Sequence, residues 1–241
     1  MTQTINIFQV IKNRSKIIDG QQTLYLYPNC IDSIINAISS SSFNYKLYVY
    51  DFHSDDYPLY DWMPNKLKDK LDYEIIQTNS EFFDKGEGLN YSRDLFTEDD
   101  FLVYLDVDVI VTKSFIERIE ARFNTDNAVG FFAPYFLAED GLNGHKVLES
   151  VGNLWIRHKD LLKLPPWISM NCWGGEDTIF LYNCIKNGLK VFRETDTDLY
   201  HQWHPIDLRN KYYKGGDPPK ADYAQAIREY YKTGILKEIT K

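Results

Sequence analysis

Residues 101–115 read FLVYLDVDVIVTKSF, an apolar, strand-like run interrupted by Asp106 and Asp108. Such runs are typical of strands that are covered on both faces, where an unpaired carboxylate costs several kcal/mol. Side chains two residues apart in a strand point to the same side, so both carboxylates are expected to project together from the carboxyl end of this strand. The stretch therefore predicts a buried strand whose end holds a partner for two acids.

Similar strand-like runs alternate with segments of helical periodicity along the chain. The expected strands are residues 5–11, 45–50, 73–77, 101–105 and 128–133, and the expected helices include 30–39, 114–123 and 178–186. Ser114 is the expected cap of the second of these helices, and Asn187 with Gly188 the expected end of the third. The alternation predicts an α/β fold with a largely parallel sheet. Segments 134–146 and 164–171 are expected to be long loops that carry substrate contacts.

Composition limits the class of protein. The net charge of -8 argues against a nucleic-acid binder, which would need clustered Lys and Arg. Cys30, Cys172 and Cys184 lie far apart without a CxxC spacing, which favours reduced thiols and a cytoplasmic protein. No window of the sequence reaches the roughly 18 apolar residues of a transmembrane segment. We therefore expect one cytoplasmic domain without a membrane span.

Two acidic or histidine-bearing motifs suggest a metal site. Asp106 and Asp108 follow a strand at the edge where open α/β sheets bind ligands, and convergent carboxylates suit Mn²⁺ or Mg²⁺, which could grip a diphosphate. His201 and His204 lie in DLYHQWHPID and could add imidazole ligands. The alternatives are that the acids merely end the strand and that the histidines are ordinary solvated or hydrogen-bonded side chains.

A third motif, NCWGGEDTIF at 171–180, suggests an acceptor site. Trp173 offers an aromatic face to a sugar, and Gly174 and Gly175 allow the backbone to approach a ligand. Glu176 or Asp177 could accept a proton from an acceptor hydroxyl. The alternative is that these acids only stabilise a helix N-terminus through its dipole.

Taken in order, these motifs resemble inverting glycosyltransferases of the GT-A fold, specifically family 2 enzymes and the related group with a galactosyltransferase-type C-terminal half. The resemblance lies in VYDFHSDD at 49–56, GEGLNYSRDLFTEDDFLVYLDVD at 86–108, WGGED at 173–177 and HQWH at 201–204. It covers about residues 5–205. It implies a Rossmann-like nucleotide-diphospho-sugar transferase fold, with a mostly parallel central sheet flanked by helices.

On the donor side, the resemblance implies contacts to a nucleoside-diphosphate sugar, expected to be a UDP-sugar. The contact residues would be Asp51, Arg93, Asp106 and Arg14. Asp51 would meet the base and Arg93 would support the diphosphate. Asp108 would be the principal ligand of Mn²⁺ (or Mg²⁺). The further ligand candidates are His204, which is the better match, His201 and Asp106.

On the acceptor side, the resemblance implies that Asp177 is the general base and that Glu176 contacts the acceptor beside Trp173, Gly174 and Gly175. Sequence spacing alone permits either acid to take the proton. The expected reaction is metal-dependent transfer of a sugar, with inversion, to a hydroxyl of a saccharide or glycan.

Two other functions fit single features of the sequence. LDVDVIV also resembles the nucleophile motif of haloacid-dehalogenase-like phosphatases, although that motif normally follows the first strand. The 18 tyrosines and 5 tryptophans could instead belong to a non-catalytic carbohydrate-binding module.

The expected domain organisation is a GT-A domain over 1–206 followed by a C-terminal tail over 207–241. The donor half would span about 1–112 and the acceptor half about 113–206. The tail has eight Lys or Arg and five Asp or Glu, so it is net basic. We expect it to pack back on the domain as a helix, with weak contact to a membrane surface as the alternative.

Overall fold

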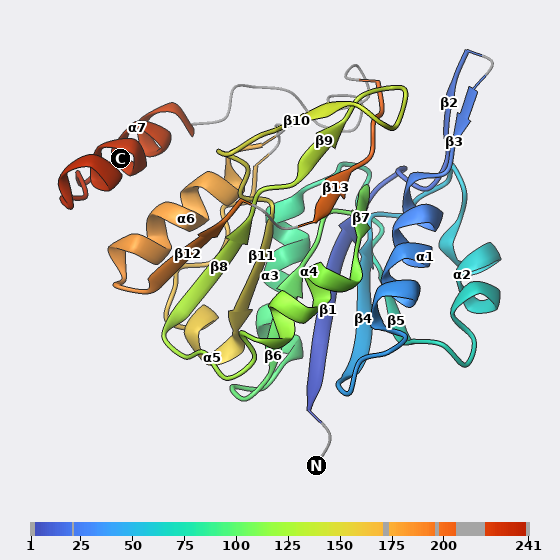
Figure 1. The fold of residues 1–241 in the computed structure, drawn as a ribbon, viewed down its shortest axis with the longest axis horizontal. Coiled ribbons are helices and arrows are strands. Elements are labelled where there is room, and N and C mark those ends of the chain that lie inside the picture. Colours follow the sequence, from blue (N-terminus) through green and yellow to red (C-terminus); the bar gives the residue numbers. More distant parts are fainter. Residues whose placement is uncertain (1–2, 21, 171–173, 196–197, 206–219, 240–241) are drawn as a thin grey trace.

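The computed structural model describes residues 3–20, 22–170, 174–195, 198–205 and 220–239. A seven-stranded sheet with the order β12-β8-β11-β6-β1-β4-β5 forms its centre (Figure 1). These strands are β1 Thr4–Ile11, β4 Asn44–Asp51, β5 Asp72–Gln77, β6 Phe101–Tyr104, β8 Ala128–Phe132, β11 Asn153–Arg157 and β12 Lys190–Glu194. Only β11 runs antiparallel to its neighbours in this sheet. The predicted α/β fold with a largely parallel sheet is confirmed.

Helices cover both faces of this sheet. The helices are α1 Leu26–Ile38, α2 Leu59–Leu67, α3 Lys85–Leu95, α4 Lys113–Glu120, α5 His158–Leu161, α6 Glu176–Lys186 and α7 Lys220–Thr233. Side chains of α1, α2 and α4 form one hydrophobic cluster, and those of α3, α5, α6 and α7 form a second. Strand β1 contributes Ile5 and Ile7 to the first cluster and Phe8 and Val10 to the second. The alternating side chains of a strand that is buried on both faces thus explain its continuous apolar sequence.

A smaller sheet crosses the carboxyl end of the large one. Its order is β10-β9-β13-β7, with β7 Val109–Val111, β9 Tyr135–Leu137, β10 Gly144–Lys146 and β13 Leu199–His201. A separate hairpin pairs β2 Ile17–Asp19 with β3 Gln22–Leu24. The prediction of a loop over 134–146 is therefore wrong, because β9 and β10 pair with each other and β9 also pairs with β13. Residues 164–170 form the expected loop, and residue 171 lies outside the described residues.

The stretch over 101–115 is not a single strand. Strand β6 ends at Tyr104, a turn includes Val107 and Asp108, and β7 begins at Val109 in the other sheet. The expectation that Asp106 and Asp108 share one side of a strand is thus wrong, because the chain changes sheet between β6 and β7. The two carboxylates consequently have different partners.

Helix ends agree with the sequence in one case and differ in the other. Asn187 is the C-cap of α6, and Gly188 follows with a φ of +74°, as expected. Helix α4 is capped by Thr112, whose side chain accepts a hydrogen bond from the Phe115 amide, rather than by Ser114. Both residues are good caps, so the sequence alone did not separate them.

The site region is positioned by the order of the strands. The chain passes from β1 to β4 and β5 on one side and then returns to β6 on the other side of β1. The carboxyl ends of β1 and β6 therefore meet where the strand order reverses, which is the usual ligand crevice of open α/β sheets. Arg14 follows β1, and Asp106 and Asp108 follow β6.

The C-terminal helix α7 lies beside α6 (Figure 1). Its buried residues are Tyr223, Ala226 and Ile227, and Tyr223 contacts Tyr182 of α6 edge to face. The Tyr182 hydroxyl also donates to the Lys237 carbonyl and accepts from the Ile239 amide. Within the described parts of the chain, we find no helix with the length and apolar character needed to cross a bilayer.

A glycine in β8 is required by the packing of this sheet. Gly130 lies opposite Trp155 of β11, and a Cβ atom at Gly130 would lie 1.9 Å from Trp155 Nε1. We expect Gly130→Ala to lower the free energy of unfolding by about 1–3 kcal/mol through overpacking. Chemical denaturation measures this loss. Adding Trp155→Ala, which removes the indole atoms that this Cβ would meet, should shrink the cost of the alanine at position 130, whereas an equal cost in both backgrounds would contradict the contact.

Candidate active site

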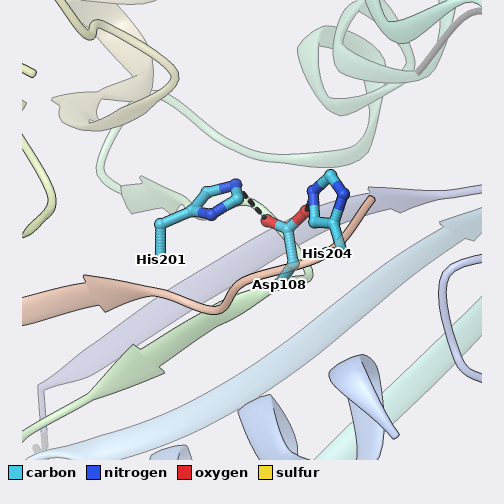
Figure 2. Close-up of side chains that lie close together, drawn as sticks. All are labelled: Asp108, His201 and His204. Atoms are coloured by element: carbon cyan, nitrogen blue, oxygen red, sulfur yellow. Dashed lines mark ion pairs between the residues drawn. The ribbon is translucent and has the colours of Figure 1, made fainter. Parts of the chain in front are cut away.

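Asp108, His201 and His204 form a compact cluster at the crevice. Asp108 comes from the turn after β6, His201 ends β13, and His204 follows three residues later. The Nε2 atoms of His201 and His204 each lie 3.4 Å from a different oxygen of the Asp108 carboxylate. Figure 2 shows the two imidazoles on either side of this carboxylate. One potential ligand atom from each residue lies within 4.8 Å of the others, so the three could hold a metal ion.

The chemistry of this cluster fits a divalent cation. Asp108 is buried, and its Oδ1 atom has no hydrogen-bond partner among the described residues. The 3.4 Å separations exceed the 2.7–2.9 Å that is usual for charged hydrogen bonds. Burial by itself raises the pKa of Asp108, but His201, His204 and Arg14 outweigh it and hold that pKa well below its ordinary value. An ionised carboxylate with two imidazoles is a ligand set that suits Mn²⁺.

The small sheet orients one of these imidazoles. The ring of Phe136, from β9, stacks on His201 with centroids 4.3 Å apart and planes at 13°. Phe136 also stacks on His145 of β10. The backbone amide of Gln202 donates to the Asp108 carbonyl, which ties β13 to the turn after β6. Phe136 was missed in the sequence because its segment was expected to be a loop.

Asp106 belongs to a second cluster, around Lys85. Lys85 Nζ lies 2.9 Å from Asp106 Oδ1, 3.1 Å from Asp177 Oδ2 and 3.9 Å from Glu176 Oε1. Burial alone would lower the pKa of Lys85, but the three carboxylates raise it well above its ordinary value. Lys85 is therefore a partly buried ammonium group that neutralises acids from two segments.

Sequence reasoning missed Lys85, although a signal was present. Lys85 is the first residue of α3, directly after the N-cap Asp84, whose side chain accepts from the Glu87 amide. A cation at this end of a helix is disfavoured by the helix dipole, so a lysine there indicates a specific anionic partner.

Glu176 and Asp177 begin α6, as predicted from the WGGED motif. Gly174 and Gly175 precede them with φ values of +75° and +110°, a left-handed conformation that favours glycine. Burial raises the pKa of Asp177 to about 8; Glu176 and Asp106 add to this rise and Lys85 opposes it. Trp173 lies outside the described residues.

The remaining predicted donor residues divide into two groups. Asp51 ends β4 and is buried, and its Oδ1 atom accepts from the amide and the hydroxyl of Ser54. Burial raises the pKa of Asp51 despite these bonds. Arg14 lies close enough to Asp108 to lower its pKa, and the Arg14 Nη1 atom is buried without a hydrogen-bond partner in the described segments. Asp51 and Arg14 thus both lie at the carboxyl edge of the sheet.

Arg93 does not join them. Its two terminal nitrogens donate to the carbonyls of Leu161 and Leu164. Arg93 lies eight residues after Lys85 in α3, about 12 Å along the helix axis. These hydrogen bonds hold the chain after α5, so the diphosphate contact expected of Arg93 stays a prediction. Lys85 is the cation that α3 brings to the carboxylates.

Comparison with known proteins gives structural but no family-level similarity. No family model matches the sequence. Among solved structures, S. aureus TarS in complex with UDP-GlcNAc matches with a TM-score of 0.62 and 12% identity, over 95% of this chain and 65% of TarS 1-349. The mannosyltransferase PcManGT from Pyrobaculum calidifontis, in complex with GDP-Man and Mn²⁺, matches with a TM-score of 0.60 and 10% identity, over 100% of this chain and 66% of that one.

A third structure, GalNAc-T7 with UDP, GalNAc and Mn²⁺, matches with a TM-score of 0.59 and 13% identity, over 95% of this chain and 48% of that one. The chain therefore spans between about half and two thirds of the length of these three proteins. At such identities the similarity shows the fold alone. The chain has the GT-A fold, and the solved structures that it resembles are glycosyltransferases with this fold.

Proposed function

We propose that the protein is a metal-dependent, inverting glycosyltransferase. It would move a sugar, of the hexose type, from a nucleoside-diphosphate sugar to a hydroxyl of a saccharide or glycan. The observation that carries this proposal is the cluster of Asp108, His201 and His204 at the crevice of a GT-A fold. The neighbours in complex with UDP-GlcNAc, with UDP and Mn²⁺, and with GDP-Man and Mn²⁺ support a nucleotide-sugar donor in general. We favour a UDP-sugar because of the family resemblance of the motifs.

The donor would lie across the ends of β1, β4 and β6. Asp108, His201 and His204 would hold the cation, which when bound neutralises negative charge on the leaving diphosphate. Arg14 has a buried nitrogen without a partner among the described residues, so it could donate to a phosphate oxygen. Asp51 ends β4 and would contact the base. Asp106 would face the donor from beside Lys85.

Asp177 is the better candidate for the general base. Its Oδ2 atom is held by Lys85, whereas its Oδ1 atom is buried and has no hydrogen-bond partner in the described parts of the chain. The raised pKa of Asp177 makes it a stronger base than an ordinary aspartate. Glu176, with Trp173, Gly174 and Gly175, would contact the acceptor.

The transfer itself would be a single displacement. Asp177 Oδ1 takes the proton of the acceptor hydroxyl, and the hydroxyl oxygen forms a bond to the anomeric carbon. The bond from that carbon to the diphosphate oxygen breaks, and its electron pair leaves with the diphosphate. Attack from the face opposite the leaving group inverts the configuration.

The two other functions have less support. A phosphatase nucleophile at Asp106 would need a free carboxylate, but both of its oxygens are hydrogen-bonded, to Lys85 and to Asn153. For a carbohydrate-binding module the tryptophans give little support, because Trp62, Trp155 and Trp167 are buried in the core, although four tyrosines are exposed: Tyr25, Tyr60, Tyr91 and Tyr231. Neither alternative explains the Asp108 cluster.

Calorimetric titration with UDP tests the proposed function. We expect binding in Mn²⁺ that is lost in EDTA and weakened at least about tenfold by Asp108→Ala, because removal of a ligand weakens the site. Asp72→Ala is a matched control, since Asp72 is exposed at the amino end of β5, away from the crevice at the carboxyl ends of the strands. Equal UDP binding in Mn²⁺ and EDTA would count against the metal site, and no UDP binding by the parent protein would count against the UDP-sugar donor.

Substitution of each acid at the start of α6 tests the base. We expect Asp177→Asn to lower the rate of UDP release from the best UDP-sugar by about 10²–10⁴-fold, the usual contribution of a general base. Glu176→Gln should lower it by less than about tenfold, because it removes an acceptor contact rather than the proton acceptor. Steady-state assays with both variants decide the assignment. If Asp177→Asn stays within threefold of the parent while Glu176→Gln loses the activity, the roles are exchanged.

A further inference from the structure

Lys85 is the common partner of carboxylates that come from two different segments. It begins α3, its side chain is 18% exposed, and its Nζ atom bonds both Asp106 after β6 and Asp177 in α6. Glu176 Oε1 is also within 3.9 Å. Three acids that are buried or partly buried at such distances repel one another, so removal of the cation between them is expected to change their arrangement.

On one side, this ion cluster packs closely against the backbone at Gly152. A Cβ atom at Gly152 would lie 2.7 Å from Asp106 Oδ2, 3.3 Å from Asp177 Oδ2 and 3.4 Å from Lys85 Nζ. Gly152 directly precedes Asn153 of β11. The cluster is thus packed closely against the start of β11, which leaves its side chains little freedom.

The two aspartates depend on Lys85 to different degrees. Asp106 has a second anchor, because Asn153 Nδ2 donates to its Oδ2 atom and Asn153 Oδ1 accepts from its backbone amide. Within the described segments, the Asp177 carboxylate has Lys85 as its single hydrogen-bond partner. Loss of Lys85 should therefore release Asp177 and leave Asp106 in place.

We propose that Lys85 is the positioning residue for Asp177. Its hydrogen bond to Oδ2 leaves the buried Oδ1 atom without a partner in the described segments, so that Oδ1 can take the proton. Its bond to Asp106 fixes the base relative to Asp108, which lies two residues after Asp106. This role rests on the proposed function. It makes Lys85 the physical link between the donor and acceptor halves of the site.

Kinetics of three variants test this role: Lys85→Met, Lys85→Arg and Lys85→Met combined with Asp177→Asn. For Lys85→Met we expect kcat for UDP release to fall about 10²-fold, as for misplacement of a catalytic group, while Mn²⁺-dependent UDP binding stays within about threefold. Lys85→Arg keeps the charge and should recover kcat to within about tenfold of the parent. The double variant should be no more than about threefold slower than Asp177→Asn alone, because residues that act as one unit are not additive. Lys113→Met, at an exposed lysine of α4, is the matched control.

Several results would overturn the role of Lys85. The first is weakened UDP binding with an unchanged kcat in Lys85→Met. The second is a kcat of Lys85→Arg that is no higher than that of Lys85→Met. The third is a double variant whose loss of kcat equals the product of the losses in the two single variants. If Lys85→Met does not fold, the double variant Lys85→Arg with Asp177→Asn replaces it. A non-additive loss of kcat in that variant supports the role, and an additive loss contradicts it. A parent protein without UDP binding or release would instead refute the proposed function, which separates the two failures.

Discussion

The arrangement of the site depends on one electrostatic constraint, which is that carboxylates buried or partly buried at the carboxyl edge of the sheet need cations. Asp106, Asp108 and Asp177 all lie in this region, and ionised groups without partners would be costly there. The structure separates them into two clusters. Asp106 and Asp177 share the ammonium group of Lys85, whereas Asp108 lies between two imidazoles and keeps one oxygen without a hydrogen bond among the described residues.

This separation follows from the path of the chain after β6. The chain leaves the large sheet at Tyr104, turns at Asp108 and enters the small sheet as β7, which pairs with β13 and so brings His201 to the turn. Because the two aspartates diverge, they can serve different parts of the proposed reaction, in which Asp108 would bind the metal and Asp106 would lie between the donor and the base. The lysine and histidine partners come from α3 and β13, so elements far apart in the chain complete the site.

Much of the fold could be predicted from local patterns, because apolar runs and caps are local properties. All five strands predicted from apolar runs are present, as are the helix over 176–186 and its end at Asn187. The two separate motifs that contain Asp108 and the histidines also identified residues that the structure brings together. Three features depend instead on pairing between distant segments, which the periodicity of a sequence does not predict. They are the break between β6 and β7, the strands β9 and β10, and the stacking of Phe136 on His201. Arg93 and Lys85 are both cations of α3. The three-dimensional structure is needed to show that Lys85, at the start of the helix, is the one that reaches Asp106 and Asp177.

The most direct test of this account is the anomalous diffraction of crystals grown with Mn²⁺ and UDP. We predict one strong manganese peak within about 2.0–2.3 Å of an Asp108 oxygen and of a ring nitrogen from each of His201 and His204, with the diphosphate completing the coordination. Asp106 should remain on Lys85. A manganese peak between Asp106 and Asp177, with Lys85 displaced, would contradict the separation of the two clusters.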